Sequence, residues 1–175
     1  MTRQPAPGNA RNRSTPVPTL RLRLKPQEPR SGYVDGAWWP HSDDLTAELP
    51  DLLAALTVRL GAIARVVYNH SEWGRTPTKL ITGDRTVQLD CHRPHPPNTI
   101  EVRGINREAI ALLVVPHCCD PSNAHAAVTN AAAPNSTATV DTLLGISVGA
   151  RQRRTLATDA QQRWLAFRKP ARVGG

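Results

Sequence analysis

The sequence predicts one α+β domain with a mostly antiparallel β-sheet of about six strands and two helices on one face of the sheet. Apolar residues alternate with polar ones in several short segments, which is the period of a half-buried strand. Leucines recur at helical spacing between residues 45 and 60, and a second helical pattern spans about residues 120–133. These patterns follow the order strand, helix, five strands, helix, written β-α-β-β-β-β-β-α.

Leucines mark the first strand and the first helix. Every second residue of the segment 20–24 is leucine, and Pro26 ends this strand. The helix has N-cap candidates in residues 42–44 and a natural stop at Gly61. Pro50 either kinks the helix or opens its main segment in the first turn. The predicted buried face consists of Leu45, Leu49, Leu52, Leu53, Leu56 and Leu60.

Five segments rich in β-branched residues predict the other strands, at residues 63–69, 78–82, 85–90, 98–104 and 109–116. Gly83 and Asp84 are typical of a two-residue hairpin between the second and third of these strands. Short connections favour antiparallel neighbours, because a parallel crossover needs about a dozen residues or more. The last helix starts with Asp120 as N-cap and Pro121 as first helical residue. Its predicted buried residues are Ala124, Ala127, Val128 and Ala131.

Composition divides the 175 residues into a domain at about residues 19–133 and two basic tails. Residues 1–18 have little to bury and predict a disordered tail, while residues 134–175 predict a largely flexible tail with a short helix over 158–168. Residues 1–30 carry seven Lys or Arg and one acid, and residues 136–175 carry seven and two, whereas residues 31–135 carry eight and eleven. The net charge of +8 therefore belongs to the ends, and the middle offers no electrostatic footprint for nucleic acid.

Hydropathy and cysteine content predict a cytoplasmic protein without a membrane partner. No stretch approaches the roughly 18 apolar residues that span a bilayer, and the N-terminal segment lacks the apolar core of a signal peptide. Three cysteines, of which Cys118 and Cys119 are adjacent, do not form a disulfide framework, so we expect reduced thiols. We expect no cofactor.

A long motif carries a family resemblance. Residues 35–50 read DGAWWPHSDDLTAELP, preceded by LKP at residues 24–26 and followed by LLVVP at residues 112–116. This pattern resembles a family of small actinobacterial domains of unknown function, whose members share the segment D-G-A-W-W-P-x-S-x-D-L-x-x-E-L-P. The likeness covers roughly residues 20–133 and implies a folded domain over this span. It implies no activity.

Two adjacent tryptophans in this motif are the first candidate site. Adjacent side chains of an extended segment point to opposite faces, and Gly36 and Pro40 bound the pair. We expect one ring to fill the gap between the first helix and the sheet and the other to stay partly exposed. We favour a structural role, since tryptophan buries a large area. The alternative is an aromatic wall of a pocket for a small ligand, made by Tyr33, Trp38, Trp39, His41 and Trp73.

Two loops rich in cysteine and histidine give a second hypothesis, a zinc site or an enzyme. A structural zinc site needs four such ligands from converging loops, but the chain has no C-x-x-C pair and no regular histidine spacing. It also lacks a nucleophile elbow, a P-loop and a dinucleotide fingerprint. We therefore favour the absence of a metal and of catalysis. The candidate ligands are Cys91, His92, His95, His117, Cys118 and Cys119.

The basic tails give a third hypothesis, an association with nucleic acid. Their cations could contact phosphates and their aromatic rings could stack on bases, although a solvated tail is the favoured interpretation. The candidate contacts are Arg151, Arg153, Arg154, Arg163, Trp164, Arg168 and Lys169. The sequence as a whole favours a small cytosolic binding or interaction domain without catalysis, with a small ligand or protein partner near Trp38 and Trp39.

Overall fold

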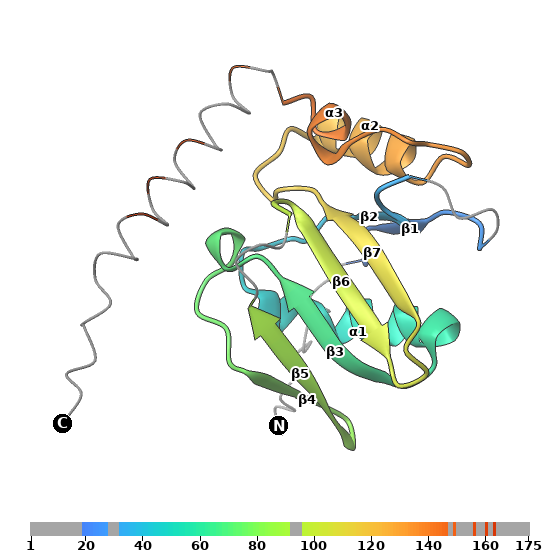
Figure 1. Ribbon diagram of the computed structural model, residues 1–175, viewed down its shortest axis with the longest axis vertical. Coiled ribbons are helices and arrows are strands. Elements are labelled where there is room, and N and C mark those ends of the chain that lie inside the picture. Colours follow the sequence, from blue (N-terminus) through green and yellow to red (C-terminus); the bar gives the residue numbers. More distant parts are fainter. Residues whose placement is uncertain are drawn as a thin grey trace, which may run out of the picture.

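The computed structural model describes residues 19–27, 32–91 and 96–146, together with Gly149, Leu156, Ala160 and Arg163. The α+β class is confirmed, and the described residues form a seven-stranded sheet with three helices (Figure 1). The elements are β1 (Leu22–Leu24), β2 (Gly36–Trp38), α1 (Leu45–Leu60), β3 (Ile63–Tyr68), the 3-10 turn η1 (His70–Glu72), β4 (Lys79–Thr82), β5 (Arg85–Cys91), β6 (Thr99–Gly104), β7 (Ala109–Val114), α2 (Pro121–Ala131) and α3 (Val140–Leu143).

The sheet is mixed, which corrects the expectation of a mostly antiparallel meander. Its strand order is β1-β2-β7-β6-β3-β5-β4. The pairs β2–β7 and β3–β5 are parallel, and the other neighbouring pairs are antiparallel. The sequence interpretation assumed that strands close in the chain are neighbours in the sheet. After β3, however, residues 69–78 carry the chain to the outer edge, so β4 is the edge strand and β5 returns beside β3 in parallel.

The strand β2 was missed by the sequence interpretation, which assigned six strands. It has three residues and no alternation of apolar and polar side chains, since all three are buried. Its partner β7 lies about 75 residues further along the chain, and Asp35 extends this pairing. The Asp35 backbone N–H donates to the Ala111 carbonyl at 2.7 Å, and the Ala111 N–H donates to Asp35 Oδ2 at 2.8 Å. The carboxylate of Asp35 thus takes the place of a backbone carbonyl as acceptor for the Ala111 N–H, directly before β2.

The two longer helices match their sequence signals. Asp44 caps α1 by accepting from the N–H groups of Thr46 and Ala47, and Gly61 ends the helix with a φ of 65°. Pro50 lies inside this single helix. Asp120 caps α2 and Pro121 opens it. The buried residues of both helices are the predicted ones: Leu45, Leu49, Leu52, Leu53, Leu56 and Leu60 in α1, and Ala124, Ala127, Val128 and Ala131 in α2.

The helices lie on opposite faces of the sheet, which corrects the expectation that both cover one face. Alternate residues of β7 separate the two sides, because Leu112 faces the cluster under α1 while Leu113 faces the cluster under α2. We call these clusters the first core and the second core. Figure 1 shows α1 behind the sheet, with α2 and α3 beyond β1 and β2 at its upper end. The sequence could not show this arrangement, because the faces depend on the position of β2.

Packing in the second core continues past residue 133. Leu143 of α3 is buried there, and Ala138, Val140 and Leu144 pack against the cluster. The ammonium group of Lys25 donates to the Ser136 carbonyl at 2.7 Å, which ties this segment to the end of β1. Burial lowers the pKa of Lys25, while the carboxylate of Asp35 acts in the opposite direction. The predicted domain boundary at residue 133 stays a prediction.

The second face of the sheet is only partly covered by helices. Within the described ranges, α2 contacts β1 and β2, and no described helix packs over β6, β3, β5 and β4 on that side. In Figure 1 the viewer looks onto this bare face. No helix among the described residues is long and apolar enough to cross a membrane.

Candidate binding site

The two adjacent tryptophans lie on opposite sides of the sheet, as their extended backbone predicts. Trp38 belongs to the first core and Trp39 to the second. The expectation that one ring stays partly exposed is wrong, because Trp38 is 1% exposed and Trp39 is 6% exposed. The physical reason is the second helical layer, since α2 covers the ring that α1 cannot reach.

Each of the two rings has its own aromatic partner. Trp38 stacks on Trp73 with ring centroids 5.5 Å apart and an interplanar angle of 19°. Trp39 meets the edge of His125 at the same centroid distance, with an angle of 80°. The indole N–H groups of Trp39 and Trp73 are buried without a hydrogen-bond partner among the described residues. Packing rather than hydrogen bonding therefore holds both indoles.

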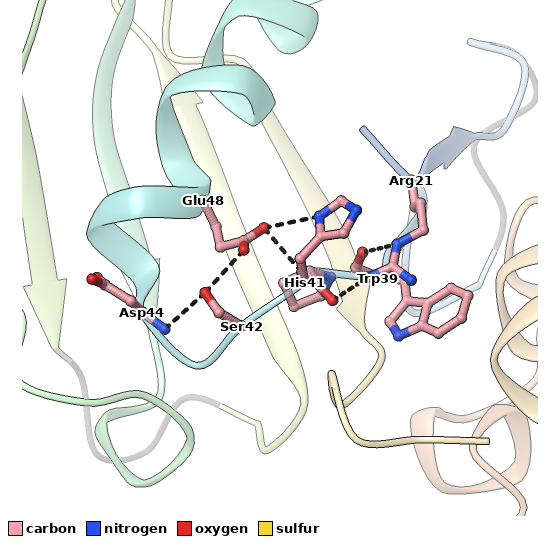
Figure 2. A network of polar contacts seen from close by, with 7 residues as sticks. Arg21, Trp39, His41, Ser42, Asp44 and Glu48 are labelled. Carbon is pink, nitrogen blue, oxygen red and sulfur yellow. Dashed lines mark hydrogen bonds and ion pairs between the residues drawn. The ribbon is translucent and has the colours of Figure 1, made fainter. Parts of the chain in front are cut away.

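Arg21, the residue before β1, holds the tryptophan segment in place. Its guanidinium carbon lies 3.7 Å from the centroid of the Trp39 ring, a cation–π contact. Its Nε donates to the Trp39 carbonyl at 3.1 Å, and Nη2 donates to the Pro40 carbonyl at 2.7 Å (Figure 2). Burial lowers the pKa of Arg21, and the charge of Glu48 acts in the opposite direction. The guanidinium group of Arg21 therefore holds both the Trp39 ring and the backbone carbonyls of Trp39 and Pro40.

Glu48 fixes the segment that leads into α1. Its carboxylate accepts from the Ser42 hydroxyl at 2.9 Å and from the His41 backbone N–H at 3.1 Å (Figure 2). His41 Nδ1 lies 3.5 Å from the same carboxylate. The Asp44 N–H donates to the Ser42 hydroxyl at 3.3 Å, which links this network to the helix cap. The polar residues of the long motif thus have structural roles at the start of α1.

Three of the five residues of the tryptophan hypothesis are buried, and two are at the surface. Tyr33 is 70% exposed, and His41 is exposed beside Glu48. Trp73 is buried and lines a hollow of about 230 Å³ that also contacts His117 and Cys118. The lining of this hollow does not include Trp38 or Trp39. Of the three tryptophans, Trp73 alone borders this hollow, while Trp38 packs behind it in the first core.

The cysteine and histidine candidates are divided between different places. His117 and Cys118 are exposed in a turn that the Cys119 N–H closes onto the Pro116 carbonyl at 3.0 Å. Cys119 is half-buried against the second core. Cys91 is exposed at the end of β5, while His92 and His95 lie outside the described residues. In the part of the chain that the structure describes, no three His, Cys, Asp or Glu side chains are placed to hold a metal ion.

The nucleic-acid candidates lie almost entirely outside the described residues. Arg163 is described and exposed. The other six, which the structure does not describe, are Arg151, Arg153, Arg154, Trp164, Arg168 and Lys169.

A hollow on the bare face was not predicted from the sequence. Its volume is about 850 Å³. Side chains of β3, β5 and β6 form its floor, and residues 75–78 form a wall beside β5. The Leu89 N–H donates to the Thr78 carbonyl at 2.9 Å, which holds this wall against the strand. No sequence motif marks the hollow, because it depends on the parallel pairing of β3 with β5.

The floor of this hollow arranges charges in two rows across the strands. Cross-strand pairing places Arg65 opposite Arg103 and Gln88, and Lys79 lies opposite Gln88 on the next strand. The neighbouring row has Val67 between Glu101 and Asp90. We call them the cationic row and the acidic row. The cationic row is Arg103, Arg65 and Gln88, with Lys79 next to it on β4 outside the lining of the hollow, and the acidic row is Glu101, Val67 and Asp90.

Two ion pairs connect the rows. Arg65 Nη1 lies 3.0 Å from Asp90 Oδ2, and Arg103 Nε donates to Glu101 Oε1. This hydrogen bond raises the pKa of Arg103, and the charge of Glu101 adds to the effect. The guanidinium side chains remain about half exposed, at 49% for Arg65 and 52% for Arg103. The hollow therefore has a polar floor with accessible charges.

Comparison with known proteins gives a family and no function. Residues 21–131 match the model of a family of unknown function. The match begins just before β1 and ends with α2, so it spans the whole sheet and both longer helices. No curated protein and no solved structure matches the chain.

Proposed function

The chain belongs to the DUF5994 family of unknown function, and we propose that it is a non-catalytic binding domain whose ligand site is the hollow on the bare face. The observation that carries this proposal is the unequal cover of the sheet. Helices lie over both faces at β1, β2 and β7, but on one face only at β6, β3, β5 and β4. That uncovered part holds the hollow of about 850 Å³.

The size of the hollow favours a small organic molecule as its ligand. Ligand pockets usually measure about 300–1,000 Å³. Residues 75–78 line the hollow beside a floor of three strands, so a small molecule there would contact both. The floor consists of paired strands, so the backbone positions from which the polar side chains start are fixed by the sheet.

Catalysis has no comparable support. A nucleophile needs a base within hydrogen-bonding reach and a group that orients the base. Cys91 is a nucleophilic side chain that lines the hollow, and the described contacts give it no hydrogen-bonded histidine.

We also propose a cytoplasmic location, because the three cysteines are unpaired and two of them are exposed.

The test is a screen for small-molecule binding by two-dimensional NMR of the full chain, with the shifted amide signals assigned to residues. We expect ligands to shift signals of β3, β5 and β6 around the hollow. Val67→Trp should abolish these shifts, because Val67 lies in the middle of the floor between Glu101 and Asp90. Val58→Trp is the matched control, since Val58 is 89% exposed on α1. Ligands that bind equally to both variants would refute the site.

A further inference from the structure

We infer that the ligand of this hollow is an organic anion, a carboxylate or a phosphate ester, held between the guanidinium groups of Arg65 and Arg103. This inference rests on the proposed function and names the chemistry of the same site. Its basis is the arrangement of like charges on the floor.

Arg65 and Arg103 lie directly opposite one another across the antiparallel strands β3 and β6. Side chains in such a pair start about 5 Å apart, and like charges in this position destabilise a sheet. An acid at either position would form a favourable cross-strand pair. The acids lie instead one row away, opposite Val67. The floor therefore separates charge by sign, and an anion between the two guanidinium groups would add to the charge compensation that Asp90 and Glu101 provide from the next row.

Both arginines keep donors for a ligand. A guanidinium group has five N–H donors. The ion pair with Asp90 uses Nη1 of Arg65, and the bond to Glu101 uses Nε of Arg103. The other donors of both groups make no hydrogen bond to the described residues. The two acids thus orient the guanidinium groups and leave their outer edges available, and planar donors of this kind suit carboxylate and phosphate oxygens.

The wall of the hollow adds positive charge. Arg75 is exposed there and makes no ion pair or hydrogen bond with the described residues. Together Arg65, Arg75 and Arg103 outnumber Asp90 and Glu101 around the hollow. Lys79 extends the cationic row at the edge strand. The charge excess complements an anion and disfavours binding of the basic tail of the same chain, whose residues 136–175 carry seven Lys or Arg and two acids.

A nucleic-acid strand is a poorer occupant than a small anion. Sheets that bind single strands use exposed aromatic rings, on which the bases stack. Tyr68 is the tyrosine that lines this hollow, and it is 3% exposed within the first core. The floor offers charge and hydrogen-bond donors without a stacking platform.

The test is an NMR titration of the full chain, reading the arginine Nε–H signals and the amides of β3 and β6. The probes are inorganic phosphate and succinate, with succinamide as an uncharged analogue of the dicarboxylate. We expect both anions to shift these signals and succinamide to leave them unchanged. Arg65→Gln and Arg103→Gln should each lower the anion affinity about tenfold or more, because each removes charge-assisted hydrogen bonds. A preference for one anion assigns the ligand to phosphate esters or to carboxylates.

Arg85→Gln is the matched control. Arg85 is exposed on the same strand as Gln88, but it lines a separate hollow beside Leu53 and Ala54 of α1. We expect this variant to bind both anions as the parent does, and thermal melts of all three variants verify folding. Equal losses in the three variants would refute the inference, as would unchanged affinity in Arg65→Gln and Arg103→Gln. If neither anion binds while uncharged molecules from the screen still bind in the hollow, the inference of an anionic ligand is refuted and the proposed function stands. If nothing binds there, both fall.

Discussion

Trp38 stacks on Trp73 across the first core, with ring centroids 5.5 Å apart. The first ring comes from β2 and the second from the residue after η1, so the contact joins two segments separated by α1 and β3. Offset stacking of aromatic rings contributes about 0.5–1.5 kcal/mol beyond the area that the rings bury.

Trp38→Ala should lower the free energy of unfolding by about 3–5 kcal/mol, because the fully buried ring leaves a large cavity in the first core. Chemical denaturation measures the loss. A double-mutant cycle with Trp73→Ala should give a coupling energy of about 1 kcal/mol. A coupling energy of zero would mean that the stacked geometry adds nothing to burial.

Trp39→Ala should be about as destabilising as Trp38→Ala, by the same range of about 3–5 kcal/mol. The ring is 6% exposed, and Arg21 and His125 both pack on it. Tyr33→Ala is the control, since Tyr33 is 70% exposed and its loss should change stability by less than about 0.5 kcal/mol. If Trp39→Ala lowered the free energy of unfolding as little as Tyr33→Ala does, the expectation of a partly exposed ring would be restored.

Glu48→Ala should lower the free energy of unfolding by about 2 kcal/mol, because the Ser42 hydroxyl and the His41 N–H both lose a charged acceptor. Thermal or urea unfolding checks this value. Asp51→Ala on the same helix is the matched control and should have little effect, since Asp51 is exposed. If both variants unfold alike, the network in Figure 2 does not stabilise the fold.

A chain of residues 19–133 should fold alone but melt at a lower temperature than a chain of residues 19–146. The longer chain retains Leu143, which is 8% exposed, and burial of a leucine contributes about 1.5–3 kcal/mol. Leu143→Ala in the full chain should reproduce most of the difference. Leu156→Ala should not, since Leu156 is 64% exposed. Identical melting of the two shortened chains would place the stable domain at residue 133.

The purified full chain should carry no stoichiometric metal. The described residues bring no three metal-binding side chains together, and a structural zinc site needs four ligands. Elemental analysis of protein purified without chelator provides the measurement. About one zinc per chain, lost on His95→Ala or His117→Ala, would show that the cysteine- and histidine-rich loops converge on a metal.

Local signals predicted α1 and α2 well, because their determinants are close together in the chain, whereas α3 was not predicted. The cap residues Asp44 and Asp120 and the buried stripes are all within a few turns of one another. The sheet order was predicted poorly. Pairings such as β2 with β7 join residues about 75 positions apart, and the three residues of β2 carry no periodic pattern.

The candidate site shows the same limit. The sequence marks Trp38 and Trp39 by their chemistry, and their opposite directions follow from an extended backbone. Their burial on both sides depends on where α2 packs, which no local pattern specifies. The opposition of Arg65 and Arg103 depends on the register between two strands, and a shift of one strand by one residue would place the two side chains on opposite faces.

The position of the β6–β7 hairpin has a consequence for synthesis of the protein. This hairpin fills the space between β2 and β3, although both of those strands precede it in the chain. As the ribosome releases the chain from its N-terminus, β2 and β3 emerge with inner edges that have no partner until residues 99–114 follow. Unpaired strand edges promote aggregation. The sheet is complete only once residues 99–114 have left the ribosome, because the β6–β7 hairpin is the element that joins the β1–β2 pair to β3, β5 and β4.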